Sequence, residues 1–238
     1  MRAVILAGGK GTRLLPFTTL IPKPLMPLGG RYSILEIVLM QLSRGGFTHV
    51  TLAVNHLSNL IKAYFGDGSK WGLRIDYSLE EEPLSTIGPL TLIEDLPENF
   101  LIMNGDILCD MDFGVFLQEH IKRASEITVS TFRREVNIDF GVLQYDEDLA
   151  LKSFQEKPIH SFDVSMGIYA MSRVVVERLE AGAPYGFDTL MLDSLKDGNR
   201  IQVDPFDGFW LDIGRPDDYS RADENFDELI KRLGIALP

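Results

Sequence analysis

The sequence has one cysteine, Cys109, among its 238 residues. A single thiol cannot form a disulfide within the chain, which excludes a disulfide-stabilised scaffold and favours a cytoplasmic location. No stretch approaches the ~18 consecutive apolar residues that a membrane-spanning helix needs, and the first residues lack the pattern of a signal peptide. We therefore expect no membrane partner.

Basic residues are scarce as well. Lys and Arg total 23 against 35 Asp and Glu, which gives a formal net charge of -12. A surface of that sign repels phosphate backbones, so we expect no nucleic-acid partner. It does not exclude a nucleotide ligand, because a small pocket can be locally basic within an acidic protein. Hydrophobic residues make up 45% of the chain, which is enough for a sizeable core.

Short apolar runs alternate with amphipathic helical patterns in the first half of the chain. The runs are typical of buried strands, and they lie at 3–6, 50–54, 73–77 and 100–103, with helical patterns at 33–44 and 57–65. This alternation predicts an α/β fold with three layers, built on a doubly wound, mixed and mainly parallel sheet.

The second half is richer in strand patterns. They lie at 127–132, 141–144, 151–154, 164–170 and 201–203, and a helical pattern follows at 217–233, with Pro216 before it and Gly234 after it. We interpret these strands as a mixed extension of the same sheet that forms a lid. The chain is then a single domain, 1–238, with lobes at 1–110 and 111–216 and a C-terminal helix at 217–238.

A glycine-rich loop follows the first predicted strand directly, in the sequence Leu6-Ala-Gly-Gly-Lys-Gly-Thr-Arg13. Its three glycines let the backbone approach a ligand closely, so that N–H groups can cradle phosphate oxygens. Arg13 can bind a phosphate group through two parallel hydrogen bonds. The loop matches neither the Walker nor the Rossmann pattern, and by itself it equally fits a tight turn with incidental charge.

Two further segments carry charged residues in positions that the backbone holds firmly. Lys23 lies among three prolines in Ile21-Pro-Lys-Pro-Leu-Met-Pro27, which stiffen an extended stretch. Asp106 ends Asn104-Gly-Asp106 after a predicted strand, where sheets of this type bind their ligands. Taken singly, each has a structural explanation: Lys23 as a solvent-facing lysine, Asp106 as a turn cap and Asp212 as a surface acid.

In order along the chain, these segments resemble the motifs of one enzyme family. After the glycine-rich loop come Pro22-Lys-Pro24, Glu82-Pro-Leu84, Asn104-Gly-Asp106, Phe140-Gly-Val142, Glu156-Lys-Pro158, Gly167-Ile-Tyr169 and Trp210-Leu-Asp-Ile-Gly214. From residue 1 to about 226 the chain resembles the sugar-1-phosphate nucleotidyltransferases, also called nucleotide-sugar pyrophosphorylases. Within them it is most similar to bacterial guanylyltransferases that act on mannose or manno-heptose 1-phosphate.

The resemblance implies the Rossmann-like fold of nucleotide-diphospho-sugar transferases, with 1–110 binding the nucleotide and the lid in 111–216 binding the sugar phosphate. It implies four catalytic residues: Arg13, Lys23, Asp106 and Asp212, the two aspartates binding Mg²⁺. The implied nucleotide contacts are Leu6, Gly8, Gly9, Gly11, Thr12, Arg13, Glu80, Pro83, Ser85 and Gly105. The implied sugar-phosphate contacts are Gly141, Glu156, Lys157 and Ser165.

The chemistry of such a reaction suits these residue types. A phosphate monoester has a second pKa of about 6, so the attacking oxygen is already anionic at neutral pH and needs no general base. The difficulty is bringing two polyanions together, which calls for positioning and charge neutralisation. Two carboxylates suit Mg²⁺, which prefers hard oxygen ligands and keeps several waters. Arg13, Lys23 and Lys157 would complete a cationic cage.

Three acids, Glu80, Glu81 and Glu82, lie in the segment that reads the base in this family. An ionised carboxylate only accepts hydrogen bonds, and guanine offers two adjacent donors, whereas uracil and thymine flank N3–H with acceptors. GTP is therefore the expected substrate, with Glu80 as the first choice of reader. The alternatives are a solvated acidic hairpin and an enzyme for UTP or dTTP.

Two departures from the family pattern fall near the substrates. Ser85-Thr86-Ile87 replaces the usual Gly-Thr-Ala and is expected to add bulk to the base pocket. Ser165-Met-Gly167 replaces Asn-Ala-Gly, which leaves the identity of the sugar open. Three histidines, His56, His120 and His160, have no partner pattern and are expected at the surface or in loops.

Other classes remain open. A catalytically silent, nucleotide-sugar-binding regulatory subunit would be expected to lose the loop arginine, a lysine or an aspartate, and none is lost. A glycosyltransferase that uses a nucleotide sugar would need an acidic pair on one short loop. A homodimer is an ordinary expectation.

Overall fold

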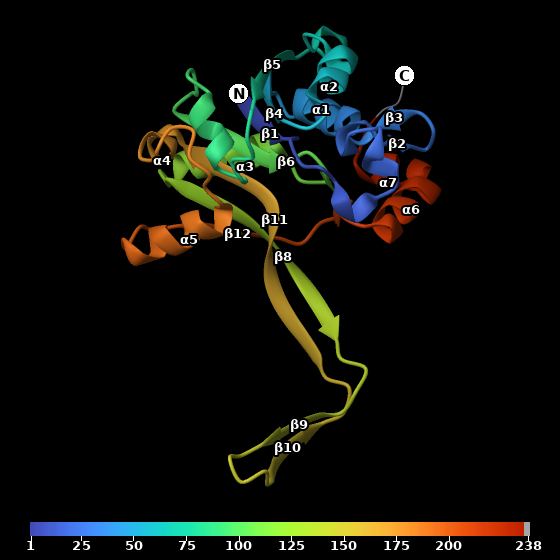
Figure 1. The fold of residues 1–238 in the computed structure, drawn as a ribbon, viewed down its shortest axis with the longest axis vertical. Helices are drawn as coiled ribbons and strands as arrows, with labels where there is room; N and C mark the ends of the chain where they lie inside the picture. The colour runs from blue at the N-terminus through green and yellow to red at the C-terminus, as the bar shows by residue number, and fades with distance from the viewer. Residues whose placement is uncertain (236–238) are drawn as a thin grey trace.

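The computed structural model describes residues 1–235, and its framework is one seven-stranded sheet in the order β12-β8-β11-β6-β1-β4-β5 (Figure 1). Its strands are β1 (Arg2–Leu6), β4 (His49–Val54), β5 (Arg74–Leu79), β6 (Asn99–Asn104), β8 (Ile127–Asn137), β11 (Ile159–Ser172) and β12 (Gln202–Phe206). Three two-stranded pieces are β2 (Pro27–Leu28) with β3 (Tyr32–Ser33), β7 (Ile107–Cys109) with β13 (Trp210–Asp212), and β9 (Val142–Tyr145) with β10 (Leu151–Gln155).

The centre of the sheet is parallel and the added strands make it mixed. β1 pairs in parallel with β4 and β6, and β5 extends β4 in parallel. β11 runs antiparallel to both β6 and β8, while β12 is parallel to β8. The expected mixed and mainly parallel sheet is confirmed, because the second-half strands join the first-half sheet at its β6 edge.

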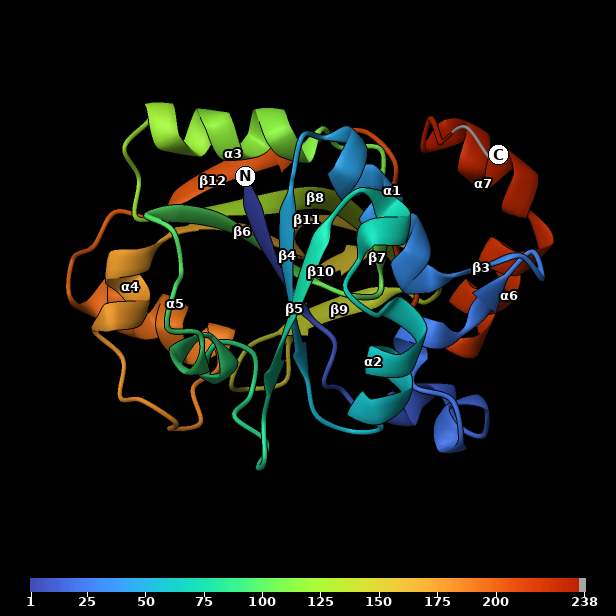
Figure 2. The ribbon, with the colours of Figure 1, turned by 90° about the horizontal axis from the view of Figure 1, so that it is seen from above.

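Two apolar cores, one on each face of the sheet, make the three layers. Alternate residues of β1 point to opposite faces: Ala3 and Ile5 belong to one core and Val4 to the other. The first core packs α1 (Ile34–Arg44), α2 (Ser58–Phe65), α3 (Phe113–Lys122) and α7 (Phe226–Arg232). The second packs α4 (Arg173–Glu177) and α5 (Phe187–Lys196), and Figure 2 shows the helices on either side of the strands.

The C-terminal helix differs from the sequence expectation. Two helices, α6 (Pro216–Glu224) and α7, replace the single helix expected over 217–233, with Pro216 as the first residue of α6. The break is at Asn225, whose side-chain amide donates to the Arg221 carbonyl oxygen at 2.8 Å in place of the helix continuing. Residues 236–238 of the expected element lie outside the described residues.

An arm projects from the sheet. β8 and β11 continue past the body as a two-stranded ribbon, and β9 and β10 form a hairpin at its far end (Figure 1). The strands of the second half do extend the sheet, as expected, but residues 133–165 do not fold back as a lid. Because no side chain in this stretch is buried, the arm has no core of its own.

His120 is buried, contrary to its expected position at the surface or in a loop. It lies on the inner face of α3 and is 1% exposed, with Nδ1 2.8 Å from the Thr128 hydroxyl. Burial lowers the pKa of His120 to about 4. No helix within residues 1–235 is both long and apolar enough to cross a membrane.

Candidate active site

The glycine-rich loop begins where β1 ends, between β4 and β6. Gly11 has a φ of +60°, a conformation that glycine adopts without strain. The Thr18 hydroxyl donates to the Gly11 carbonyl oxygen at 2.8 Å and pins the loop to the next turn. The Gly105 N–H donates to the Leu6 carbonyl oxygen at 3.0 Å, so the ends of β1 and β6 are held together.

Two hollows open beside this loop. The smaller has a volume of about 200 Å³ and the larger about 580 Å³, and both are lined by Leu6, Gly9, Arg13 and Asp106. They therefore form one continuous cleft across the carboxyl ends of the parallel strands, the position at which such sheets bind ligands. The smaller hollow adds Gly11, Thr12, Lys23 and Gly105; the larger adds Gly8, Lys10, Glu80, Pro83 and Ser85. All the predicted nucleotide contacts thus line one cleft.

Glu80 is the one buried acid of the 80–82 run. It is 8% exposed, whereas Glu81 and Glu82 are exposed. Its backbone N–H donates to the Val54 carbonyl oxygen at 2.9 Å, and its Oε2 accepts from the Leu84 N–H at 3.1 Å. A Cβ at position 8 would lie 2.9 Å from Glu80 Oε1, so glycine there lets the carboxylate reach the cleft wall. Burial raises the pKa of Glu80 above its usual value.

Strand pairing brings the two predicted metal-binding aspartates together. β13 lies antiparallel to β7 with Asp212 opposite Ile107, and the Ile213 N–H donates to the Asp106 carbonyl oxygen at 3.1 Å. A Cβ at Gly214 would lie 3.3 Å from both Asp212 carboxylate oxygens and from Arg13 Nη1. The four predicted catalytic residues therefore come together, since Lys23 forms an ion pair with Asp106.

The two carboxylates of this cluster repel each other, although two cations lie nearby. Burial raises the pKa of Asp212, and the neighbouring Asp106 charge raises it further, while Lys23 and Arg13 oppose the shift. Lys23 forms an ion pair with Asp106. Two adjacent carboxylates suit a divalent cation, which would relieve their repulsion. Within residues 1–235 no group of three or more His, Cys, Asp or Glu side chains is placed to hold a metal, so other ligands would come from water and substrate.

The Ser85–Ile87 departure is only partly at the cleft. Ser85 lines the larger hollow with a φ of +65°, the conformation that the usual glycine adopts readily. Thr86 also lines it and accepts from the Phe187 N–H at 2.7 Å. Ile87 is fully buried in the second core. The expectation that Ile87 adds bulk to the base pocket is wrong, because its side chain faces away from the cleft.

The predicted sugar-phosphate residues are not brought to this cleft. Gly141, Glu156 and Lys157 lie on the arm, and Ser165 is exposed at its base, where the β8–β11 register shifts. None of the four lines either hollow. Met166, the other departure, is 1% exposed and accepts from the Ser130 hydroxyl, so it faces the core and not a sugar.

Sequence reasoning missed some residues that line the larger hollow: Asn55, Thr86, Pro89 and Asn104. Asn55 follows directly after β4, and its Nδ2 donates to the Glu80 carbonyl oxygen at 3.0 Å. Its place after a buried strand, next to the carboxyl end of β1, is the signal that would have identified it.

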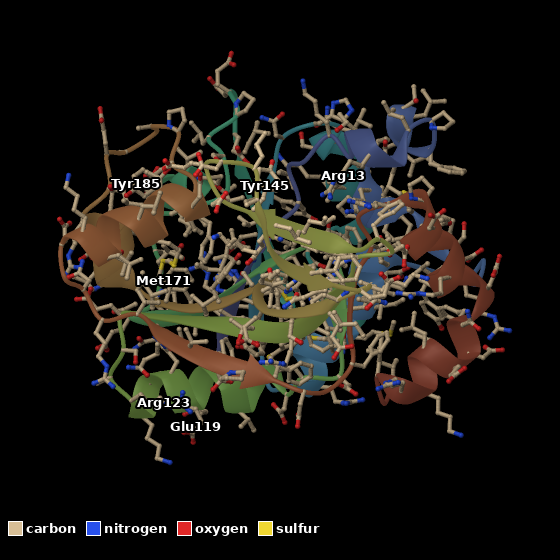
Figure 3. All side chains as sticks on the ribbon, turned by 90° about the horizontal axis from the view of Figure 1, so that it is seen from below. Arg13, Glu119, Arg123, Tyr145, Met171 and Tyr185 are labelled. Atoms are coloured by element: carbon tan, nitrogen blue, oxygen red, sulfur yellow. The ribbon has the colours of Figure 1, made fainter. Side chains whose placement is uncertain are left out.

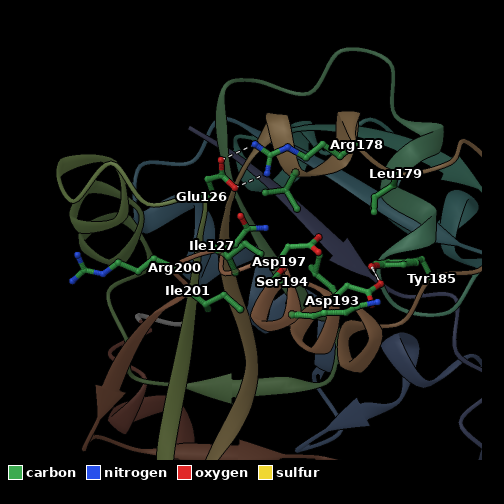
Figure 4. A pocket seen from close by; sticks show the side chains of 14 residues that line it. Glu126, Ile127, Arg178, Leu179, Tyr185, Asp193, Ser194, Asp197, Arg200 and Ile201 are labelled. Atoms are coloured by element: carbon green, nitrogen blue, oxygen red, sulfur yellow. Dashed lines mark hydrogen bonds and ion pairs between the residues drawn. The ribbon is translucent and has the colours of Figure 1, made fainter.

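A separate hollow of about 370 Å³ lies between α4 and α5 (Figure 4). Two of its acids have partners: Glu126 forms a bidentate pair with Arg178 at 2.7 and 2.8 Å, and Asp193 accepts from the Tyr185 hydroxyl at 2.7 Å. It contains none of the motif residues. Figure 3 shows Arg13 and Tyr185 on different sides of the arm.

Known proteins are similar to this chain over most of its length. A family model described as nucleotidyl transferase matches residues 2–228. The chain is similar to the mannose-1-phosphate guanylyltransferase catalytic subunit beta of Drosophila pseudoobscura pseudoobscura, 35% identical over 225 residues, covering 92% of this chain and 60% of that protein. It is also 34% identical to mannose-1-phosphate guanyltransferase beta-A of Xenopus laevis over 227 residues, covering 92% and 62%. The chain thus spans about three fifths of these curated relatives.

A solved structure matches over more of its own length. HddC from Yersinia pseudotuberculosis, crystallised in complex with GMP-PN, superposes with a TM-score of 0.72 at 27% sequence identity, covering 94% of this chain and 99% of that one.

Proposed function

The chain belongs to the nucleotidyl transferase family, and on that premise we propose that it transfers GMP from GTP to a manno-configured sugar 1-phosphate, releasing pyrophosphate. The observation that carries the proposal is the single cleft lined by the glycine-rich loop, Arg13, Lys23, Asp106 and the buried Glu80, with Asp212 next to Asp106. The names of the relatives, which are guanylyltransferases for mannose 1-phosphate, support the same reading.

The chain's own residues account for most of the chemistry. Backbone N–H groups of the loop and the Arg13 guanidinium bind the triphosphate, because they offer donors without a steric barrier. The sugar phosphate attacks the α-phosphorus in line as a dianion, so no side chain needs to remove a proton. The cleft holds the two substrates in position and neutralises part of their charge, which are the two requirements of a reaction between two anions.

We assign Mg²⁺ to Asp106 and Asp212. The fit rests on the raised pKa of Asp212 and on the adjacent Asp106, which leave a carboxylate pair with more negative charge than Lys23 alone offsets. Mg²⁺ is commonly held by one or two carboxylates together with phosphates and waters. When bound, it supplies charge neutralisation at the α-phosphate and leaving group.

Glu80 is the proposed guanine reader. Its Oε1 lies against Gly8 at the cleft wall, while Leu84 N–H fixes the other oxygen. An ionised carboxylate can accept from guanine N1–H and the 2-amino group together, and it repels the carbonyl oxygens of uracil. The cytoplasm is the proposed compartment, since the chain has one cysteine, Cys109, which is free and cannot form a disulfide within the chain.

Pyrophosphate release tests the proposal. We expect release with GTP and mannose 1-phosphate or a manno-heptose 1-phosphate, and weaker release with ATP, CTP, UTP or dTTP. A preference for UTP or dTTP would overturn the assignment of the base, and no release from any pair would favour a silent, nucleotide-sugar-binding subunit.

A further inference from the structure

The arm is a two-stranded ribbon whose two faces differ in polarity. In the β8–β11 register, Phe132 lies opposite Val164, Arg134 opposite Phe162 and Val136 opposite His160, so this face is mainly apolar. The reverse face is mainly polar: it carries the Arg133–Asp163 ion pair, and Ile159, opposite Asn137, is the one large apolar residue among its paired positions. Such alternation of apolar and polar residues is typical of a strand that is covered on one side.

Apolar side chains of this face, and of the hairpin beyond it, are exposed to solvent. Large apolar side chains that are exposed on the arm are Val136 44%, Phe140 77%, Leu143 56%, Tyr145 65%, Leu149 77%, Leu151 60%, Phe154 57%, Ile159 61% and Phe162 53%. A two-stranded ribbon alone is marginally stable in water, and contiguous exposed apolar surface marks an interaction site. Within residues 1–235, β12 pairs with β8 only as far as Phe132, and β6 pairs with β11 only from Ile168 onward, so the outer backbone edges of both strands are unpaired further out.

The cluster formed by the predicted sugar-phosphate residues Gly141, Glu156 and Lys157 lies where the ribbon meets the hairpin. A Cβ at Gly141 would lie 2.6 Å from the Phe154 ring and 3.3 Å from Glu156 Oε2, so glycine is required for these groups to pack. Lys157 has a φ of +44°, an unfavourable conformation for a lysine. Strain of this kind at an exposed position is characteristic of ligand-binding sites.

This cluster cannot reach the cleft of its own chain. β11 pairs with β6 from Ile168 onward, and Ile159 is nine residues further out. At about 3.3 Å per residue the ribbon carries the cluster roughly 30 Å from the sheet. Figure 3 looks along the arm from its free end, with the hairpin residue Tyr145 toward the viewer.

The cleft, in turn, is lined by three cationic side chains, Lys10, Arg13 and Lys23, and Lys23 is paired with Asp106. Two anionic substrates would share these cations with the proposed Mg²⁺, and none of the predicted sugar-phosphate residues lines the cleft. Beside Arg13, the segment 15–21 exposes further apolar side chains, namely Leu15 54%, Phe17 54%, Leu20 78% and Ile21 44%.

We propose that two copies of this chain exchange arms, so that Gly141, Glu156 and Lys157 of each copy complete the sugar-phosphate site of the other. The inference rests on the proposed function for the role of Lys157. A second copy fits better than a different partner, because a two-fold axis lets the same ribbon face and the same free edges pair with themselves. It also brings Lys157 to both clefts at once.

Mixing two inactive variants tests the exchange. Lys157→Ala removes the arm cation and leaves the cleft intact, and Asp212→Asn does the reverse. We expect each alone to lose about 10²-fold or more in kcat. After co-refolding at equal amounts, about half the dimers are mixed, each with one complete site, so about a quarter of wild-type activity returns. No recovery, with both variants folded by circular dichroism, overturns the proposal.

Controls separate the arm from general effects. Lys152→Ala removes another cation from the hairpin, one that pairs with Asp146 at 2.8 Å, and is expected to keep activity near wild type. Leu149→Asp is expected to convert the sedimenting dimer to monomer, while Val115→Asp, at another exposed apolar site on α3, leaves the dimer intact.

Sedimentation also distinguishes the two proposals. A wild-type dimer that Leu149→Asp dissociates, but that has no activity with any triphosphate, contradicts the proposed function and retains the arm exchange. An active wild-type monomer at assay concentration contradicts the arm exchange and retains the function.

Discussion

Replacing Glu80 by glutamine isolates the proposed reading of the base. The side chain is 8% exposed and its Oε2 accepts from the Leu84 N–H. Glutamine keeps one carbonyl oxygen for that N–H, so the fold is retained and the melting temperature changes little. The other side-chain oxygen is replaced by an amide NH₂, which faces the cleft beside Gly8. There its N–H groups would meet the N–H groups of guanine, and no hydrogen bond forms between two donors.

The expected magnitude follows from the bonds that are lost. A hydrogen bond to a charged group contributes about 1.5–3 kcal/mol, so losing the carboxylate acceptor lowers kcat/KM for GTP about 10- to 150-fold. UTP gains, because the amide NH₂ can donate to a uracil carbonyl oxygen. Initial rates with both triphosphates measure this change, with the exposed Glu81→Gln as the matched control.

The pH dependence gives a second signature of the same group. Burial raises the pKa of Glu80. Its acceptor form is therefore lost as pH falls through that raised value, and GTP turnover declines at a higher pH than an ordinary glutamate would produce. Glu80→Gln removes this acid limb. An unchanged ratio of GTP to UTP turnover in the variant would refute the reasoning.

Three other predictions concern the cleft and the core. Asp212→Asn should lower turnover by about 10²-fold or more, because it removes one of the two carboxylates proposed to bind Mg²⁺. It should not lower the melting temperature, because it also removes the repulsion with Asp106; a matching loss of stability would indicate a structural role. Gly8→Ala should weaken GTP binding in calorimetry, since its Cβ would lie 2.9 Å from Glu80 Oε1; unchanged affinity would contradict the close approach. Burial lowers the pKa of His120 to about 4, so stability falls as pH drops from about 6.5 toward 4, by up to ~3 kcal/mol. Urea titrations of wild type and His120→Gln measure this loss, which the variant should not show.

Much of the framework could be predicted from sequence because it is local. The runs at 3–6, 50–54 and 100–103 are strands within a residue or two at each end, since buried parallel strands are short and continuously apolar. The order of the motifs also placed the glycine-rich loop and Asp106 at the same edge of the sheet. Parallel strands put their carboxyl ends together whatever their loops contain.

What could not be predicted depends on contacts distant in the chain. The approach of Asp212 to Asp106 comes from the β7–β13 pair, whose three-residue strands have no pattern of their own. The inward orientation of His120 depends on which face of α3 meets the sheet. Asn225 interrupts a helical periodicity that continues on both sides of it.

The direction of the arm could not be predicted from the sequence either. Strands in a lid and strands in a projecting ribbon share one alternating pattern, so the strand patterns between 127 and 203 favour a lid, although residues 133–165 project as an arm. Their direction is fixed by the β8–β11 register and by whatever covers the apolar face, and local sequence encodes neither.

The most direct test of the central claim is GDP-sugar formation from GTP and mannose 1-phosphate, followed by mass spectrometry with pyrophosphate measured in parallel. The account predicts equal amounts of both products in wild type, dependent on the sugar phosphate and on Mg²⁺, and neither product in Asp212→Asn. Pyrophosphate release that does not need the sugar phosphate, or product formation that Asp212→Asn leaves intact, would contradict it.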